Sequence, residues 1–196
     1  CGFDTTSSIC LSHLGEDGYR ISIEVFGGGY GAGPARDGCD AVDSPMSNCG
    51  NVPVEAMDLE YDYFRVVHHS LHDDSGGVGK FRGGMGLCRH YEILKDDVTF
   101  ATYSDRFRLS SDGLFGGGTG GNAETILKRG DELRKLPSKG KFALRKGDIL
   151  MIATGGGGGY GDPAERAAAK IDRDLAEDFI SLETARDAYG LSDAAE

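Results

Sequence analysis

The sequence has 196 residues, 39% of them hydrophobic, and its 21 basic and 32 acidic side chains give a net charge of −11. This length suits one domain, or one domain with an appendage. The hydrophobic content excludes a disordered chain, the absence of a run near ~18 apolar residues argues against a membrane helix, and the negative charge argues against nucleic-acid binding. Glycine is the outlier, because 32 glycines are more than double the usual ~7%.

The start of the chain and its cysteines indicate the type of protein. The sequence begins with Cys1 in mid-pattern, so we expect a fragment of a longer protein; a cysteine exposed by self-cleavage is the alternative. The five cysteines lack a CxxC pair, and we expect reduced thiols in a cytoplasmic protein rather than a disulfide framework. A zinc set of Cys39, Cys49, Cys88 and His90 would fit no common spacing.

Five segments have the composition of β-strands. The first alternates and places Ile21, Ile23 and Val25 on one face. The last, with the sequence ILMIA, is a short continuous apolar run, typical of a strand buried on both faces. A turn at residues 95–97 joins the third and fourth strands. In chain order, we predict strands at 20–26, 61–69, 87–94, 98–103 and 149–153.

The chain changes character near its end. Asp162 is typical of a helix N-cap, and Pro163 suits the first helical position. Apolar residues then recur at three- and four-residue steps from 168 to 179 and form one stripe. Ser181 suits the N-cap of a second helix, which Gly190 would end.

These elements predict an α+β fold. We expect a β-rich body with glycine-rich turns over residues 1–160, followed by a helical hairpin over residues 161–196. Basic side chains concentrate in residues 80–148, between two acidic segments. This middle segment could face an anionic substrate or an acidic partner. We favour the other interpretation, in which it faces the acidic segments of the same fold.

Four glycine clusters punctuate the body, at residues 26–33, 74–86, 113–121 and 154–163. Glycine lets backbone N–H groups wrap a phosphate, but no cluster ends in the Gly-Lys-Ser/Thr of a nucleotide-binding loop. The fourth cluster has the strand–glycine–helix order of a dinucleotide site, although no parallel βαβ unit can follow it. We favour tight turns, bulges and close backbone approaches.

The second cluster also carries charged side chains. Asp74 precedes two glycine pairs, with Lys80 and Arg82 between them. Two interpretations stay open: the cations hold a carboxylate or phosphoryl group, or Asp74 pairs with Arg82 and pins the loop.

Histidines and polar residues outside the clusters offer further candidates. On a strand, His68 and His72 would share a face while His69 points away, at a separation of about 13 Å that is too long for one metal ion. We therefore expect solvated or edge-strand histidines. Glu55 would be a general base if partly buried, with a capping or pairing role as the alternative.

Three blocks, in order, carry a resemblance over residues 21–191. They are GGGYGAGPARDGCDAVDSPMSNCGNVPVEAMDLEY, DDSGGVGKFRGGMGLCRHYEIL and TGGGGGYGDPAERAA. Together they resemble the hydantoinase B/oxoprolinase family, whose members are longer chains. This sequence is similar to their C-terminal part.

The resemblance implies a function. The family opens cyclic amides such as hydantoins and 5-oxoproline with ATP, which is expected on a hydantoinase A-type partner subunit. A divalent metal is expected in an N-terminal part that this sequence does not include, and no metal ligand is assigned here. The alternatives are a subunit of a ketone carboxylase acting on acetone or acetophenone, or a non-catalytic assembly module.

The resemblance also implies site residues. Glu55, Asp74 and Arg82 match its blocks and are expected to be catalytic. Asn48 and Asn51 are expected to bind the substrate.

Overall fold

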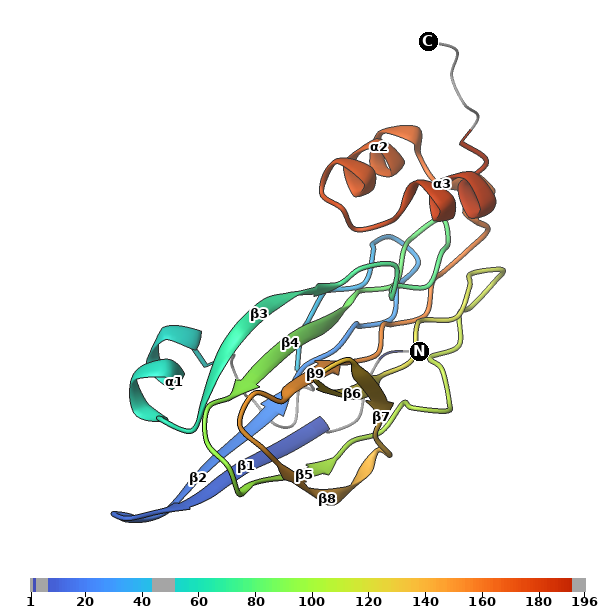
Figure 1. The fold of residues 1–196 in the computed structure, drawn as a ribbon. Coiled ribbons are helices and arrows are strands. Elements are labelled where there is room, and N and C mark those ends of the chain that lie inside the picture. Colours follow the sequence, from blue (N-terminus) through green and yellow to red (C-terminus); the bar gives the residue numbers. More distant parts are fainter. Residues whose placement is uncertain (1, 3–6, 44–51, 192–196) are drawn as a thin grey trace.

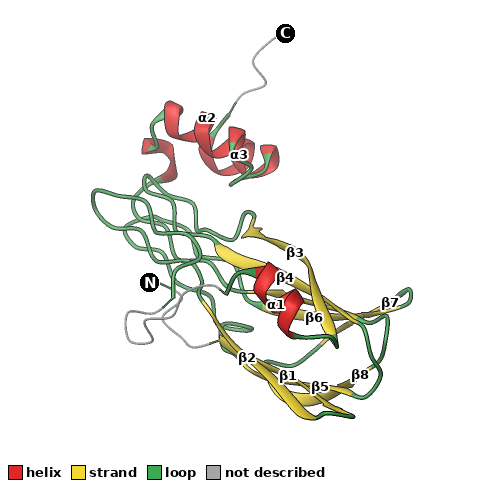
Figure 2. Ribbon diagram, turned by 90° about the vertical axis from the view of Figure 1, so that its left-hand side faces the viewer, coloured by secondary structure: helices red, strands yellow, loops and turns green. Residues whose placement is uncertain are grey.

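The computed structural model of the protein describes residues 2, 7–43 and 52–191. In this part of the chain, two antiparallel sheets stack as two layers, and two helices lie beyond one end of them (Figures 1 and 2). The predicted α+β class is confirmed. The division near residue 160 stays a prediction.

The first sheet has four strands. In spatial order they are β2 (Gly18–Phe26), β1 (Ser7–Gly15), β5 (Val98–Tyr103) and β8 (Lys139–Leu144). The predicted strands at 20–26 and 98–103 correspond to β2 and β5, whereas β1 and β8 were not predicted. Ile21 and Ile23 do share a face, but this face is the exposed one.

The second sheet has five strands. In spatial order they are β3 (Phe64–His72), β4 (Gly86–Ile93), β9 (Ile149–Ala153), β6 (Glu124–Arg129) and β7 (Glu132–Lys135). The predicted burial of β9 on both faces is wrong. Leu150 and Ile152 are buried between the sheets, while Ile149, Met151 and Ala153 are half-buried on the outer face, because no described element covers that side.

The hydrophobic core lies between the two layers. Alternate residues of each strand point inward, and fully burying such a side chain contributes about 1.5–3 kcal/mol. The core includes Ile9, Leu11, Phe26, Phe64, Leu87, Tyr91, Ile93, Val98, Phe100, Leu127, Leu144, Leu150 and Ile152.

Helix α1 (Val54–Glu60) precedes β3, and the C-terminal tail contains the short 3-10 helix η1 (Pro163–Glu165), α2 (Ala168–Ala176) and α3 (Leu182–Tyr189). None of the helices in the described ranges has the length and apolar character needed to span a membrane.

The tail begins later than predicted. The Asp162 carboxylate accepts a hydrogen bond from the backbone N–H of Ala164, as expected for an N-cap, but only η1 forms there. Arg166 is extended, and its buried guanidinium is drawn to Asp37 on another segment. The prediction that one helix begins after Asp162 and continues along the apolar stripe to Phe179 is therefore wrong, because the helix is interrupted at Arg166.

The second helix of the hairpin is confirmed. The Ser181 hydroxyl accepts a hydrogen bond from the backbone N–H of Thr184 at 3.1 Å, and Gly190 ends α3 with a φ of 69°. Helices α2 and α3 share a small apolar cluster with Val78 of the second glycine cluster, so the tail packs against the glycine-rich part of the body.

Candidate functional site

The four glycine clusters meet in one bundle. This bundle has the two stacked sheets on one side and the tail helices on the other (Figure 2). The fourth cluster is bonded to each of the others. Its carbonyl groups accept hydrogen bonds from Gly29 and Gly77, and the Gly159 N–H donates to the Gly118 carbonyl. Each of these N···O distances is between 2.8 and 3.0 Å.

Close backbone contact explains the glycine content of this bundle. A Cβ at Gly83 would lie 1.9 Å from the Gly157 carbonyl oxygen, and one at Gly157 would lie 2.1 Å from the Tyr30 carbonyl oxygen. The predicted close backbone approaches are confirmed. Because the N–H groups of Gly156, Gly157 and Gly159 donate to neighbouring carbonyls, they are not free to hold a phosphate.

Arg82 lies under the tail. Its side chain is only 4% exposed. One terminal nitrogen lies 3.2 Å from Asp40 Oδ1, and Nε lies 3.6 Å from Asp174 Oδ2 on α2. The guanidinium also stacks on the Phe179 ring, at 5.2 Å from its centroid. In this structure Arg82 joins the glycine bundle to the tail.

Further charged residues complete an ionic cluster, which we define as Asp37, Arg82, Arg166, Lys170 and Asp174. The two arginines and Asp174 are buried, whereas the other two side chains are partly exposed. Arg166 has no exposed side-chain surface and donates to Asp37 at 2.9 Å and to Asp174 at 2.5 Å. Lys170 donates to Asp37 at 2.8 Å. Burial opposes ionisation of Asp37, but hydrogen bonds from Arg166 and Lys170 outweigh it and lower the pKa to about 2.

Asp74 also contacts the tail. Its carboxylate accepts a hydrogen bond from the Ser181 N–H at 2.9 Å, and its own N–H donates to the Phe179 carbonyl at 3.3 Å. Its φ of 55° is a left-handed conformation that aspartate tolerates better than most residues. Asp74 and Arg82 thus each contact Phe179 and a second residue of the tail, rather than forming the ion pair that one interpretation of the sequence expected.

Glu55 lies in another part of the molecule. It is in the first turn of α1, which packs beside β3 at the end of the sheets away from the tail (Figure 1). Glu55 is exposed, whereas the general-base hypothesis requires partial burial. Asn48 and Asn51 lie outside the described residues. The structure therefore brings Asp74 and Arg82 together and places Glu55 elsewhere.

The histidines behave as edge-strand residues. His68 and His72 share the outer face of β3, an edge strand, and His69 points to the other face. The His68 ring stacks on His90 at 4.6 Å, and His72 Nδ1 lies 2.9 Å from the Thr154 carbonyl oxygen. Among the described residues, no three His, Cys, Asp or Glu side chains converge as a metal site would require.

The thiols also lie apart. Cys39 is in the glycine bundle and Cys88 is on β4, both free, and burial raises the pKa of the Cys88 thiol to about 11. Cys49 is outside the described residues.

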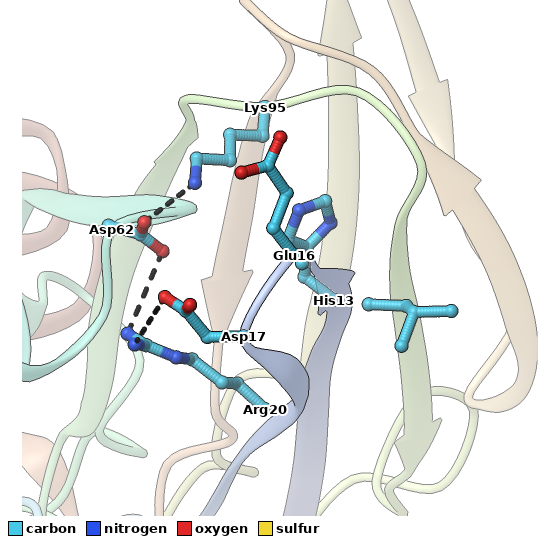
Figure 3. Close-up of a pocket in the computed structure, with 8 residues that line it drawn as sticks. His13, Glu16, Asp17, Arg20, Asp62 and Lys95 are labelled. Atoms are coloured by element: carbon cyan, nitrogen blue, oxygen red, sulfur yellow. Dashed lines mark hydrogen bonds and ion pairs between the residues drawn. The ribbon is translucent and has the colours of Figure 1, made fainter.

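A pocket of about 460 Å³ opens at the β1–β2 turn. Figure 3 shows the Asp62 carboxylate between Lys95 and Arg20. Lys95 Nζ lies 2.6 Å from Asp62, and this hydrogen bond lowers the pKa of the Asp62 carboxyl. Glu16 and His13 line the same pocket. Charges of both signs suit a small polar ligand, but they come from three separate turns, so no pattern in the sequence indicates them.

A buried polar group inside the sheets was also missed. Glu24 is 6% exposed and accepts hydrogen bonds from Arg89 and from the Tyr91 hydroxyl. Burial raises the pKa of Glu24 despite these partners. Arg89 also donates a hydrogen bond to His69 Nδ1 on β3 at 3.1 Å. Burial and the Arg89 guanidinium lower the pKa of His69. Because Glu24 alternates with isoleucines, the sequence pattern could not show that it points inward.

Comparisons with known proteins assign relatives to the chain. A family model described as hydantoinase B/oxoprolinase matches residues 1–163. Over 194 residues the chain is 31% identical to the B subunit of a putative D-/L-hydantoinase of Pseudomonas sp. (strain NS671), covering 97% of this chain and 32% of that protein. Over 168 residues it is 37% identical to 5-oxoprolinase of Dictyostelium discoideum, covering 82% of this chain and 13% of that protein.

The fold also occurs in a solved structure. The nucleotide-free structure of acetone carboxylase, from work on ATP-dependent acetone carboxylation, matches with a TM-score of 0.81 over 95% of this chain and 29% of that chain. At 16% identity this likeness shows the fold alone. The chain spans about a third or less of the length of each of these proteins.

Proposed function

Because the chain belongs to the hydantoinase B/oxoprolinase family, we propose that it forms part of a subunit that opens cyclic amide rings with ATP. The proposed substrates are hydantoins, 5-oxoproline or similar lactams. The proposed partner is a hydantoinase A-type subunit.

One observation carries this proposal. The match to the B subunit of a putative hydantoinase covers 97% of the chain, so it includes both the body and the tail, although the family model ends at residue 163. Because that relative is one subunit of a hydantoinase, the match also supports a partner subunit. The 5-oxoprolinase relative acts, by its name, on a cyclic amide of the same class.

The described residues do not fit a nucleotide or metal centre. The glycine amides are bonded to one another, and no metal-binding group converges. In this proposal ATP binds to the partner, where it would supply phosphorylation of the amide oxygen, and a divalent metal is held in the N-terminal part of the subunit. We therefore assign no chemical step to either group in this chain.

A ketone carboxylase is the second candidate, favoured by the likeness in fold to acetone carboxylase. The deciding assay uses the purified full-length protein with its A-type partner. We expect ATP-dependent release of the open-chain acid from a hydantoin or 5-oxoproline, measured by mass spectrometry. Fixation of labelled bicarbonate into acetone without ring opening would replace the amide proposal with the carboxylase.

The assembly-module alternative has a separate test. If the chain is an assembly module, deletion of the residues after Asp162 should abolish partner binding, while substitutions in the glycine-rich loops should leave activity unchanged. Retained partner binding after this deletion would remove that alternative.

The catalytic role of Glu55 stays a proposal, although its side chain is exposed on α1 and lacks the burial that a general base requires. Substitution tests this role directly. If Glu55 transfers a proton, Glu55→Gln lowers turnover about 10²–10⁴-fold. Glu60→Gln, on the same helix and also exposed, is the matched control and should leave turnover unchanged. Equal turnover of the two variants would remove Glu55 from the site. The proposed roles of Asp74, Arg82, Asn48 and Asn51 stay predictions.

A further inference from the structure

We propose that the outer face of the β2-β1-β5-β8 sheet docks the partner subunit, and that the partner presents an apolar surface flanked by acidic side chains. The identity of the occupant rests on the proposed function. We define this outer sheet face by the exposed sides of its four strands. It contains Leu14, Tyr19, Ile21, Ile23, Val25, Tyr103, Lys139 and Lys141.

Strand β2 exposes its apolar side and buries its polar side. Ile21 and Ile23 are 45% and 68% exposed, whereas Ser22 and Glu24 are 5% and 6% exposed. A strand that faces water normally has the reverse pattern. The alternation therefore indicates that the side facing outward in this structure is covered in the assembled protein.

The register makes the exposed apolar residues contiguous. Ile23 lies beside Cys10, which lies beside Ala101 on β5 and then Lys141 on β8. At the turn, Leu14 pairs with Tyr19, whose hydroxyl donates to Ser12 Oγ at 2.9 Å and holds the ring across the face. The exposed apolar residues run along β2 and include Leu14 at the end of β1. Ser8, Cys10 and Ser12 face the same side from β1, and the face ends in lysines along β8.

The lysines specify the kind of partner. Lys139 pairs with Asp105 at 3.1 Å, while Lys141 has no ion-pair partner among the described residues. Within the outer sheet face the charged residues are lysines, so a second copy using the same face would bring no carboxylate to them. Charge complementarity therefore favours a different surface with acidic side chains. No helix or strand of the described part lies over this face (Figure 2).

A photo-crosslinker at position 23 identifies the occupant. Benzoyl-phenylalanine replaces Ile23 in the full-length protein, which is assembled with the purified A-type subunit of the same organism and irradiated. We expect a crosslink to the A-type subunit, located by peptide mass spectrometry. A crosslink to a second copy, a crosslink within the same polypeptide, or no crosslink would overturn the proposal.

Substitutions measure the two parts of the face separately. Ile23→Glu should weaken binding of the A-type subunit at least tenfold, because it places a charge among the exposed apolar residues of β2. Val67→Glu, at a site 47% exposed on β3 of the other sheet, is its control and should bind normally. Equal affinities for these two variants would overturn the proposal.

Lys141→Glu tests the charged flank. It should weaken binding at low salt, and the difference should shrink near ~0.5 M salt as charges are screened. Lys128→Glu, exposed on β6 of the other sheet, is its control. Identical affinities and salt dependences would overturn the acidic-flank assignment. These measurements of binding are independent of catalysis. If the enzyme opens the ring but Ile23→Glu binds the A-type subunit normally, the docking proposal is refuted and the proposed function is not.

Discussion

At Gly83, the lack of a side chain is a packing requirement. A Cβ there would lie 1.9 Å from the Gly157 oxygen, and both backbones belong to the hydrogen-bonded bundle. Neither backbone segment can move away without breaking its hydrogen bonds to other segments of the bundle. Glycine counts in the sequence indicated such contacts but could not identify which segments meet.

Gly83→Ala should therefore destabilise the protein by at least about 2 kcal/mol, because the clash is with backbone rather than a flexible side chain. Gly15→Ala is the control, since its nearest contact would be an ordinary 3.8 Å, and should change stability by less than about 0.5 kcal/mol. Urea unfolding measures both variants. Similar midpoints for Gly83→Ala and Gly15→Ala would contradict this account of the bundle.

Arg82 and Glu55 show how far residue-level prediction reached. The charges around the second glycine cluster marked Arg82 as important, and in the structure its guanidinium contacts Asp40, Asp174 and the Phe179 ring. Asp174 and Phe179 are far from Arg82 in the sequence, and spacing carries no information about them. Glu55 was predicted as a general base if partly buried, and it lies exposed on α1.

Among the elements, those with a strong local signal were predicted best. Strands β5 and β9 have the predicted bounds, and α3 has both of its predicted caps. Strands β1, β6, β7 and β8 were missed because serines and lysines dilute their apolar alternation. These four strands are stable through pairing with neighbours rather than through their own composition.

The tail elements depend on the ionic cluster, and Asp174 is its central acid. Asp174→Ala would leave two buried guanidinium groups, those of Arg82 and Arg166, without this partner. We expect a loss of about 3–5 kcal/mol in the stability of the tail. Hydrogen exchange should accelerate over residues 163–191 while β4 and β9 stay protected.

Asp172→Ala is the matched control, because Asp172 is exposed on the same helix. It should leave the exchange of the tail unchanged. Unaltered protection of α2 and α3 in Asp174→Ala would show that the apolar cluster alone holds the tail.

Across the molecule as a whole, Asp37 links three parts of the chain. It lies after the first glycine cluster, accepts the Arg82 N–H at 2.8 Å, and pairs with Arg166 and Lys170 of the tail. Its pKa of about 2 lies below the unfolded value near 3.9. The stabilisation is therefore complete above about pH 4 and is lost as the pH falls through 2.

Asp37→Asn should lower the free energy of unfolding by about 1–2 kcal/mol at pH 7, after allowance for partial exposure of the carboxylate. The difference from the unmodified protein should narrow as the pH falls below 4. Denaturant unfolding at pH 7, 4 and 3 measures it, with the exposed Asp17→Asn as control. A difference that is independent of pH would contradict the assigned ionic role.

The basic middle segment was favoured to face the acidic segments of the same fold, and several of its cations do so. Lys80 pairs with Glu165, Arg89 with Glu24, and Lys95 with Asp62. The cation of Lys141 is left on the outer sheet face, where the partner is proposed to bind.

The family, the α+β class, the capped helix α3 and the need for close glycine contacts all follow from the amino-acid sequence, because each has a signature within a short segment or an ordered set of blocks. Folding in three dimensions decides which glycine segments interlock, that Asp74 and Arg82 hold the tail, and that β2 exposes its isoleucines. These depend on partners far apart in the chain. A local pattern shows that a side chain alternates, but only packing shows which face is covered.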